Sequence, residues 1–317
     1  MISEAYKDLK TVGLVTETSI EKFSNSTRDS QSLPVWRDEK SGVIFIKDFY
    51  VGDNLYSSEL DVEEGKASLK RSSLEDKLDT TRRLADFQKF YYGKVVCEVG
   101  FGDGEFMKAA APHSKEFRGV ELNSLSLMDA RENGFVVEDN LSKFGENSFD
   151  TIILFHTFEH FPDPLNKLHQ MMTRLKKGGQ LIIEVPHAGD FLLRDAVACE
   201  SFKQHTLWSQ HLILHTRSSL TAMLKHTGFS GITIKGVQRY PLSNHFHWLA
   251  NGKPGGHLSS LSTIDSLSLL TCYETALARI DATDTIIAVA IKIIGIAVDI
   301  IPTPSPAIIF VAVPVFD

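Results

Sequence analysis

The chain has 317 residues, of which 43% are hydrophobic and 23% charged, a balance that allows a sizeable globular core. Its formal net charge of −7 disfavours a nucleic-acid-binding protein, because such proteins usually carry a basic face. The three cysteines are far apart, so neither a disulfide framework nor a structural zinc site is predicted, and a cytoplasmic location is expected. The charged N-terminus predicts no signal peptide, and no run of uncharged apolar residues is long enough to predict a membrane span.

Residues 1–74 are predicted to form an N-terminal arm and a β-hairpin cap. Residues 1–33 are polar and rich in serine and threonine, and they could form either a frayed arm or a loose first helix. Two β-prone runs follow, 34–37 and 43–46, around a polar turn that ends at Gly42. This pattern is typical of a β-hairpin.

Short apolar runs and amphipathic helical segments alternate over the middle of the chain, after a predicted helix over 74–92. The predicted strands are 95–99, 117–122, 135–137, 151–155 and 181–185, and the helices between them are 105–111, 125–132 and 165–176. This alternation predicts an α/β fold whose parallel sheet has helices on both faces. Right-handed crossovers then make the fold doubly wound.

Past residue 186 this rhythm gives way to two inserts, about 187–215 and 239–262, which follow the fifth and the sixth strand. The remaining predicted elements are a helix over 218–226, strands over 232–237 and 285–291, and a helix over 264–280. These strands bring the sheet to seven. The tail 293–317 is almost wholly apolar and contains four prolines, which forbid a continuous helix, and we assign it no function.

The sequence EVGFGDG, which begins at Glu98, lies where the first strand of the alternating region meets its helix. Glycines there let the backbone turn tightly and approach a ligand, and the start of the next helix offers free N–H groups. A dinucleotide fingerprint would need a glycine where Glu105 stands, which disfavours an NAD-dependent oxidoreductase. Glu98, Gly100, Gly102 and Gly104 are therefore candidates for binding a different cofactor.

Further polar residues follow the next three strands. Glu121 and Leu122 end the second strand, and a carboxylate at that place can accept both hydroxyls of a ribose. Asp139 and Asn140 follow the third strand, where side chains can meet an adenine amine. His156 follows the fourth strand. All five residues are candidates for cofactor binding.

These elements, in this order and spacing, resemble the class I methyltransferases that depend on S-adenosylmethionine (SAM). Residues 155–164 (FHTFEHFPDP) and 175–186 (LKKGGQLIIEVP) are similar to a large subgroup that carries an LEHxxDP segment and then a PGG strand. The resemblance covers about residues 75–292. It implies SAM as the cofactor and a seven-stranded sheet whose last strand is antiparallel. SAM has a ribose but no pyrophosphate, so a third spaced glycine is not required.

Histidine is the residue type that suits removal of an acceptor's hydroxyl proton near neutral pH. Eleven of the twelve histidines lie after residue 150. The first insert resembles the equivalent part of sugar C-methyltransferases, whose YHEH-like segment has a Tyr, a Glu and a final His important for chemistry. In this chain the segment reads Trp208-Ser209-Gln210-His211. The replaced Tyr and Glu favour O-methylation, with His211 as the base, over C-methylation.

The second insert mixes aromatic residues, amides and glycines, and it resembles a segment of methyltransferases encoded with surface-polysaccharide genes. The resemblance implies a sugar, a nucleotide-sugar or a polysaccharide precursor as the acceptor. His245 is the reserve candidate for the base. The candidates for acceptor binding are His160, His187, Trp208, Asn244 and His247. Although His245 and His247 could form a metal pair, no carboxylates cluster beside them in the sequence, so no metal is predicted.

Two alternatives stay open, a methyltransferase for another small metabolite and a non-catalytic interaction protein with the SAM-binding fold. Methylation of nucleic-acid amines is disfavoured, because HTFE follows the fourth strand where such enzymes often carry an Asn-Pro-Pro-aromatic motif or its acidic equivalent. The predicted partner is therefore a small-molecule or carbohydrate acceptor.

Overall fold

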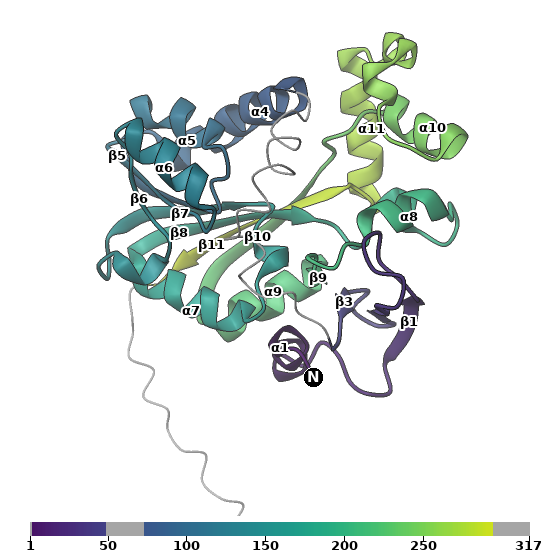
Figure 1. Ribbon diagram of the computed structural model, residues 1–317, viewed down its shortest axis with the longest axis horizontal. Helices are drawn as coiled ribbons and strands as arrows, with labels where there is room; N and C mark the ends of the chain where they lie inside the picture. The colour runs from purple at the N-terminus through teal and green to yellow at the C-terminus, as the bar shows by residue number, and fades with distance from the viewer. Residues whose placement is uncertain (1, 49–72, 294–317) are drawn as a thin grey trace, which may run out of the picture.

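The computed structural model describes residues 2–48 and 73–293 (Figure 1). Its central sheet contains β4 (Val95–Val99), β5 (Glu116–Val120), β6 (Val136–Glu138), β7 (Phe149–Phe155), β8 (Leu175–Pro186), β10 (Phe229–Val237) and β11 (Thr285–Lys292). The strands lie in the order β10-β11-β8-β7-β4-β5-β6. The five strands from β8 to β6 are parallel, whereas β11 is antiparallel to both of its neighbours. The predicted seven-stranded sheet with an antiparallel last strand is confirmed.

Helices cover both faces of this sheet (Figure 1). On one face lie α4 (Ser73–Tyr91), α5 (Glu105–Ala110) and α6 (Ser124–Glu132), and on the other α7 (Pro164–Arg174) and α9 (Arg217–His226). Successive side chains of a strand point to opposite faces. Val96 and Ile153 accordingly belong to the core under α4, α5 and α6, whereas Cys97 and Ile152 belong to the core under α7 and α9. Strands buried on both faces explain the continuous apolar runs of the sequence.

The N-terminal residues form a helix, α1 (Glu4–Thr11), and three strands of a second, smaller sheet. These strands are β1 (Ile20–Ser24), β2 (Val35–Asp38) and β3 (Ile44–Ile46). β2 and β3 pair as the predicted hairpin, and β1, which we did not predict, adds to its edge. α1 is neither frayed nor loose, because Tyr6 and Leu9 are fully buried and the Tyr6 ring stacks on Phe45.

The first insert completes the N-terminal sheet. It contains η4 (Phe191–Leu193), α8 (Glu200–Thr206) and β9 (Ile213–Leu214). β9 pairs with β3, which gives the strand order β1-β2-β3-β9. The N-terminal cap is thus joined by backbone hydrogen bonds to a segment more than 160 residues further along the chain, a pairing that no local pattern predicts.

The second insert is more regular than we expected. It contains α10 (Leu242–Asn251), η5 (Gly256–Leu258) and η6 (Ser260–Ile264), and α11 (Leu267–Arg279) follows. Gly252 ends α10 with a φ of +65°, so this glycine is a helix cap rather than part of an irregular loop. α10 and α11 stand together beside α8, outside the layers of the central sheet (Figure 1).

Smaller differences concern the ends of elements. The predicted helix 165–176 stops at Arg174, because Leu175 already belongs to the long strand β8. Three short turns, η1 (Ala111–His113), η2 (Leu141–Lys143) and η3 (Phe158–His160), complete the described elements. Part of the predicted N-terminal arm and the tail from 294 lie outside the described residues. Within the described ranges, no helix combines the length and the apolarity needed to cross a membrane.

Candidate active site

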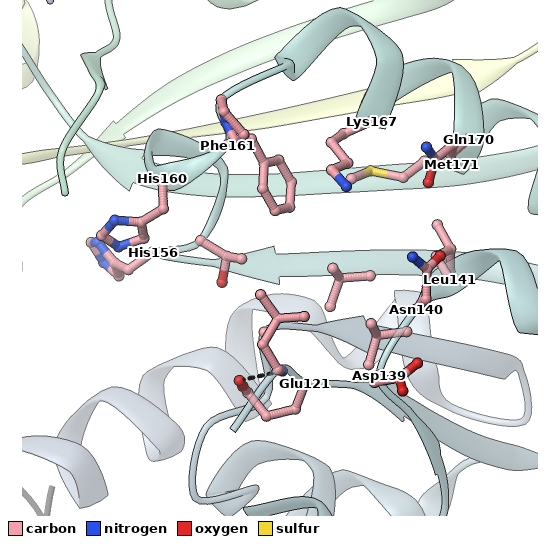
Figure 2. Close-up of a pocket in the computed structure, with 16 residues that line it drawn as sticks. Glu121, Asp139, Asn140, Leu141, His156, His160, Phe161, Lys167, Gln170 and Met171 are labelled. Atoms are coloured by element: carbon pink, nitrogen blue, oxygen red, sulfur yellow. Dashed lines mark hydrogen bonds between the residues drawn. The ribbon is translucent and has the colours of Figure 1, made fainter. Parts of the chain in front are cut away.

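A cavity of about 310 Å³ lies at the carboxyl ends of β4, β5, β6 and β7, where ligands bind in open α/β sheets. α7 forms the wall opposite these strand ends. Asp139 and Asn140 lie at one end of the cavity, and His156 and His160 lie at the other end (Figure 2). The lining residues are Val99, Gly100, Val120, Glu121, Leu122, Asp139, Asn140, Leu141, His156, Thr157, His160, Phe161, Pro162, Lys167, Gln170 and Met171.

The glycine-rich turn after β4 shapes one wall of this cavity. Gly100 has a φ of +77°, and a Cβ there would collide with the side chain of Thr157. Only glycine fits both conditions without strain. Gly102 donates its N–H to Glu121 Oε2 at 2.9 Å, and Gly104, with a φ of +70°, caps the start of α5.

Among the described residues, Glu121 is held in place by backbone groups. Oε1 accepts the N–H of Leu122 at 2.7 Å (Figure 2) and the N–H of Asn123 at 3.0 Å, while Oε2 accepts the N–H of Gly102. A carboxylate offers about four acceptor positions. At least one position on Oε2 is therefore left for a hydroxyl in the cavity, which suits the binding of a ribose.

The end of the cavity near β6 combines apolar surface with polar groups. Leu141 is buried, and Met171 faces it from α7 (Figure 2). Lys167, Gln170 and Met171 were not predicted as site residues, although their spacing of three and four places them on one face of a helix. Asp139, an exposed residue that directly follows β6, pairs with Lys143 at 2.9 Å.

Glu98 lies in β4, directly before the turn, and is almost fully buried. Among the described residues, its Oε2 has no hydrogen-bond partner and its side chain is not part of the cavity wall. Burial raises its pKa to about 8, Arg83 opposes this rise, and the charge of Glu121 adds to it. An ammonium group bound at the turn would bring a positive charge toward this carboxyl. SAM carries an ammonium group, a ribose and an adenine, so the cavity fits it.

His156 occupies the opposite end of the cavity in an unusual backbone conformation, with a φ of +50°. Its Nε2 accepts a hydrogen bond from Arg239 at 2.9 Å, and Arg239 is paired in turn with Asp79 of α4. These contacts join the strand β7, the loop after β10 and the helix α4. A non-glycine residue at positive φ persists where its surroundings hold it, and such residues cluster at functional sites.

Glu184, near the carboxyl end of β8, is completely buried and lies 3.4 Å from His156 Nε2. It accepts hydrogen bonds from Arg82 at 2.9 Å and from Arg83 at 2.6 Å. Burial alone would raise its pKa, but the two arginines and His156 hold it well below its usual range. This network was not predicted from the sequence. The sequence contains one sign of it, a glutamate inside an apolar strand, because a buried carboxylate requires a buried counter-charge.

Glu159, His160 and His211 meet beside His156. One potential ligand atom from each of the three lies within 4.8 Å of the other two. Glu159 is 1% exposed, and the effect of burial on its pKa is outweighed by His156, His160 and His211, which lower it to about 2. Burial lowers the pKa of His211 to about 3, and the nearby His160 contributes to this.

Comparison with known proteins identifies the family. Residues 71–234 match the family described as a methyltransferase domain. The chain belongs to this family. Its enzymes take SAM as the cofactor, in agreement with the fit of the cavity.

Two curated proteins are similar to this methyltransferase, and both are named ubiquinone biosynthesis O-methyltransferase. The protein from Idiomarina loihiensis is 31% identical over 100 residues, which cover 28% of this chain and 41% of that protein. The protein from Coxiella burnetii is 27% identical over 169 residues, which cover 49% of this chain and 71% of that protein. The methyltransferase thus spans less than half the length of the first of these relatives.

Solved structures of similar shape include a SAM-dependent methyltransferase from Archaeoglobus fulgidus. It is 18% identical, with a TM-score of 0.49, and the match covers 74% of this chain and all of that one. The phosphoethanolamine N-methyltransferase 2 of Haemonchus contortus is 16% identical, with a TM-score of 0.46, over 86% of this chain and 68% of that one.

The two candidate bases of this methyltransferase lie away from the cavity wall, as far as the described residues define it. His211 lies behind His160, with ring centroids 5.2 Å apart, and Trp208 packs edge-on against both rings. His245 is buried between Phe191 and Tyr273, with Nδ1 2.7 Å from the Tyr273 hydroxyl. Burial lowers its pKa to about 4.

The other predicted acceptor-binding residues differ in position. His160 lines the cavity. His187 is buried, with Nδ1 3.0 Å from the carbonyl oxygen of Thr283. Asn244 accepts the N–H of Gly255 at 3.0 Å and thereby shapes the loop after α10. His247 contacts a backbone carbonyl of the same loop through Nδ1. None of the last three lies on the cavity wall formed by the described residues.

Proposed function

We propose that this methyltransferase transfers the methyl group of SAM to a hydroxyl oxygen of a small metabolite. One observation carries the proposal. The end of the cavity opposite Asp139 and Asn140 is closed by His160, with Glu159 and His211 directly behind it. A hydroxyl is a weak nucleophile until its proton is removed, and groups that can assist this removal lie where the acceptor would enter.

SAM supplies an electrophilic methyl group on a sulfonium ion. The chain's own part is to hold the reactants and to exclude water. Glu121 and the Gly100 turn fix the adenosine and methionine parts of SAM, and Phe161 and Pro162 line the same cavity as His160. Orientation of this kind can contribute on the order of 7–11 kcal/mol to lowering a reaction barrier.

The class of acceptor rests on weaker support. The names of the two curated relatives support oxygen as the methylated atom and a ubiquinone precursor as one candidate acceptor. The predicted sugar, nucleotide-sugar or polysaccharide acceptor stays a prediction, supported by the resemblance of the two inserts. The net charge of −7 supports a small acceptor rather than a nucleic acid, and the widely spaced cysteines support the cytoplasm as the site of action.

The test has two parts. Calorimetry with SAM alone measures cofactor binding, and mass spectrometry then searches for an added CH₂ group on a panel of nucleotide-sugars and hydroxylated quinone precursors. We expect SAM binding and one methylated class of compound. If the purified protein bound no SAM, the non-catalytic interaction protein would replace the enzyme as the better proposal. If the new methyl group were on carbon or nitrogen, O-methylation would be wrong.

A further inference from the structure

Glu159, His160 and His211 are brought together by a backbone hydrogen bond between distant segments. Glu159 and His160 lie in η3, directly after β7, and His211 lies just before β9. The N–H of Leu212 donates to the carbonyl oxygen of Glu159 at 2.9 Å and sets the two segments side by side. The three side chains therefore have fixed relative positions.

The hydrogen bonds of the two imidazoles determine their tautomers. His160 Nδ1 lies 2.8 Å from the carbonyl oxygen of Gln210, and His211 Nδ1 lies 3.1 Å from that of Thr206. A carbonyl oxygen only accepts, so each Nδ1 carries the hydrogen. In each neutral ring the lone pair is then on Nε2. Histidines that bind metals are usually oriented by a carbonyl or carboxylate on their other nitrogen in this way.

Glu159 places a negative charge beside the two imidazoles. Its carboxylate is buried, and Oε2 has no hydrogen-bond partner among the described residues. A buried carboxylate oxygen without a partner is costly. The arrangement is favourable when a positive charge lies among the three atoms.

We propose that a carboxylate oxygen of Glu159, His160 Nε2 and His211 Nε2 bind one divalent transition-metal ion at the acceptor end of the cavity. Two imidazoles and one carboxylate suit Zn²⁺, Fe²⁺, Mn²⁺ or Co²⁺ better than Ca²⁺ or Mg²⁺, which favour oxygen ligands. Three ligand atoms about 2.0–2.2 Å from one ion lie roughly 3.3–3.8 Å from one another. One potential ligand atom from each of the three residues lies within 4.8 Å of the other two, and His160 Nε2 lies 4.0 Å from Glu159 Oε1, so side-chain movements of about 1 Å suffice.

The role of the ion in catalysis rests on the proposed O-methylation. Three protein ligands leave coordination positions open, and His160 lines the cavity, so an acceptor hydroxyl can take one of them. A bound divalent ion lowers the pKa of a coordinated hydroxyl, as it does for water. The hydroxyl proton passes to water, and a lone pair of the hydroxyl oxygen forms the bond to the methyl carbon. The electron pair of the broken carbon–sulfur bond stays on sulfur, and the metal keeps its oxidation state. His211 then holds the ion instead of accepting the proton itself.

The test begins with the metal alone. Protein dialysed against a chelator is titrated with Co²⁺, whose visible absorption reports coordination by imidazole, and Zn²⁺ content is measured by mass spectrometry. We expect one ion per chain and a rise in Tm on binding. Glu159→Gln, His160→Ala and His211→Ala should each weaken binding at least tenfold, whereas His169→Ala, which removes an exposed histidine of α7, should not.

Several outcomes decide the proposal. Glu159→Gln leaves the side-chain volume nearly unchanged. If the wild-type protein binds Co²⁺ no better than this variant does, the proposed metal site is wrong, and a shared proton explains the cluster instead. If His211→Ala unfolds, Glu159→Gln alone decides. Turnover that is unchanged in metal-free protein overturns the catalytic role but not O-methylation. Conversely, metal binding without any methylated product leaves the site standing and contradicts the proposed function.

Discussion

At the cofactor end of the cavity, the wall comes from turns that directly follow β4, β5 and β6, and backbone N–H groups hold the carboxylate of Glu121. At the acceptor end, the residues that follow β7, such as His156 and His160, contact side chains or backbone from β8, the segment before β9 and the loop after β10, and side chains of α4 pair with β8 and with this loop. These side chains hold one another through buried ion pairs and hydrogen bonds, and the carboxylate of Glu184 is completely buried.

This difference affects how each end tolerates change. A carboxylate held by backbone groups keeps its position when neighbouring side chains are replaced. A carboxylate held by buried arginines loses its position, or leaves a charge unpaired, when either partner is replaced. The cofactor end should therefore lose affinity without losing the fold, and the acceptor end should lose stability as well.

The largest effect is expected for Glu184→Gln. The substitution keeps the volume but leaves Arg82 and Arg83 facing a neutral amide in a buried place. Breaking a buried ion pair in this way costs roughly 3–5 kcal/mol of unfolding free energy, which denaturant titration measures. The matched control is Glu116→Gln, which removes a partly exposed pair with Arg118 and should cost about 1 kcal/mol or less. Equal effects of the two substitutions would contradict the comparison.

Gly100→Ala should be next in size and should act on binding. The new Cβ collides with Thr157, and the residue must adopt a φ of +77°. We expect the dissociation constant for SAM to rise about 100-fold, equivalent to about 2.7 kcal/mol. At Gly102, a Cβ meets no described atom within 4 Å, so Gly102→Ala adds only the strain of its positive φ, about 1–2 kcal/mol. Calorimetry on folded samples compares the two variants, and a larger loss for Gly102→Ala would place the cofactor elsewhere along the turn.

Glu121→Ala should weaken SAM binding about tenfold, because a charge-assisted hydrogen bond to the ribose, worth roughly 1.5–3 kcal/mol, is lost. The fold should be unaffected, since Glu121 has only backbone partners among the described residues. Thermal unfolding of the variant checks this expectation. An unchanged dissociation constant would remove Glu121 from cofactor binding.

The smallest effect is expected for Glu98, when the change in unfolding free energy is compared over one pH unit. Its pKa is raised from about 4.5 to about 8, so the folded protein binds this proton more tightly than the unfolded chain does. The stability that this proton contributes is fully present below about pH 4.5 and is lost as the pH rises through about 8. Between these limits, unfolding free energy should fall by up to about 1.4 kcal/mol per pH unit. Glu98→Gln removes this contribution, and an identical pH dependence in both proteins would show that Glu98 is ionised in the fold.

The order of strands and helices could be predicted from the sequence, because apolar runs and helical spacing are local and strong. Six of the seven strands of the central sheet were placed within three residues, whereas β8 begins six residues before its predicted start. β1 and α10 were missed, because short polar strands and glycine-flanked helices resemble loops. At the cofactor end, candidates such as Gly100, Glu121 and Asp139 could be named because each directly follows a strand, and strand ends meet at one edge of a parallel sheet.

The acceptor end shows what the sequence left open. The histidines of both inserts were recognised as a group, but their spacing did not tell which of them approach one another. His211 meets Glu159 because β9 pairs with β3 and Leu212 binds the backbone of Glu159. His245 is kept from the cavity wall because α10 turns it toward Phe191 and Tyr273.

The sequence by itself therefore determined the family, the strands of the sheet and the residues after them, since local apolar patterns and motifs mark these. Only the tertiary structure decided that Glu184 is paired with Arg82 and Arg83, and that Glu159, His160 and His211 share one small volume. Both arrangements depend on pairs separated by 50 to about 100 residues, for which no local pattern exists. The physical reason is that buried charges and lone pairs select partners by distance in space, and the fold alone sets that distance.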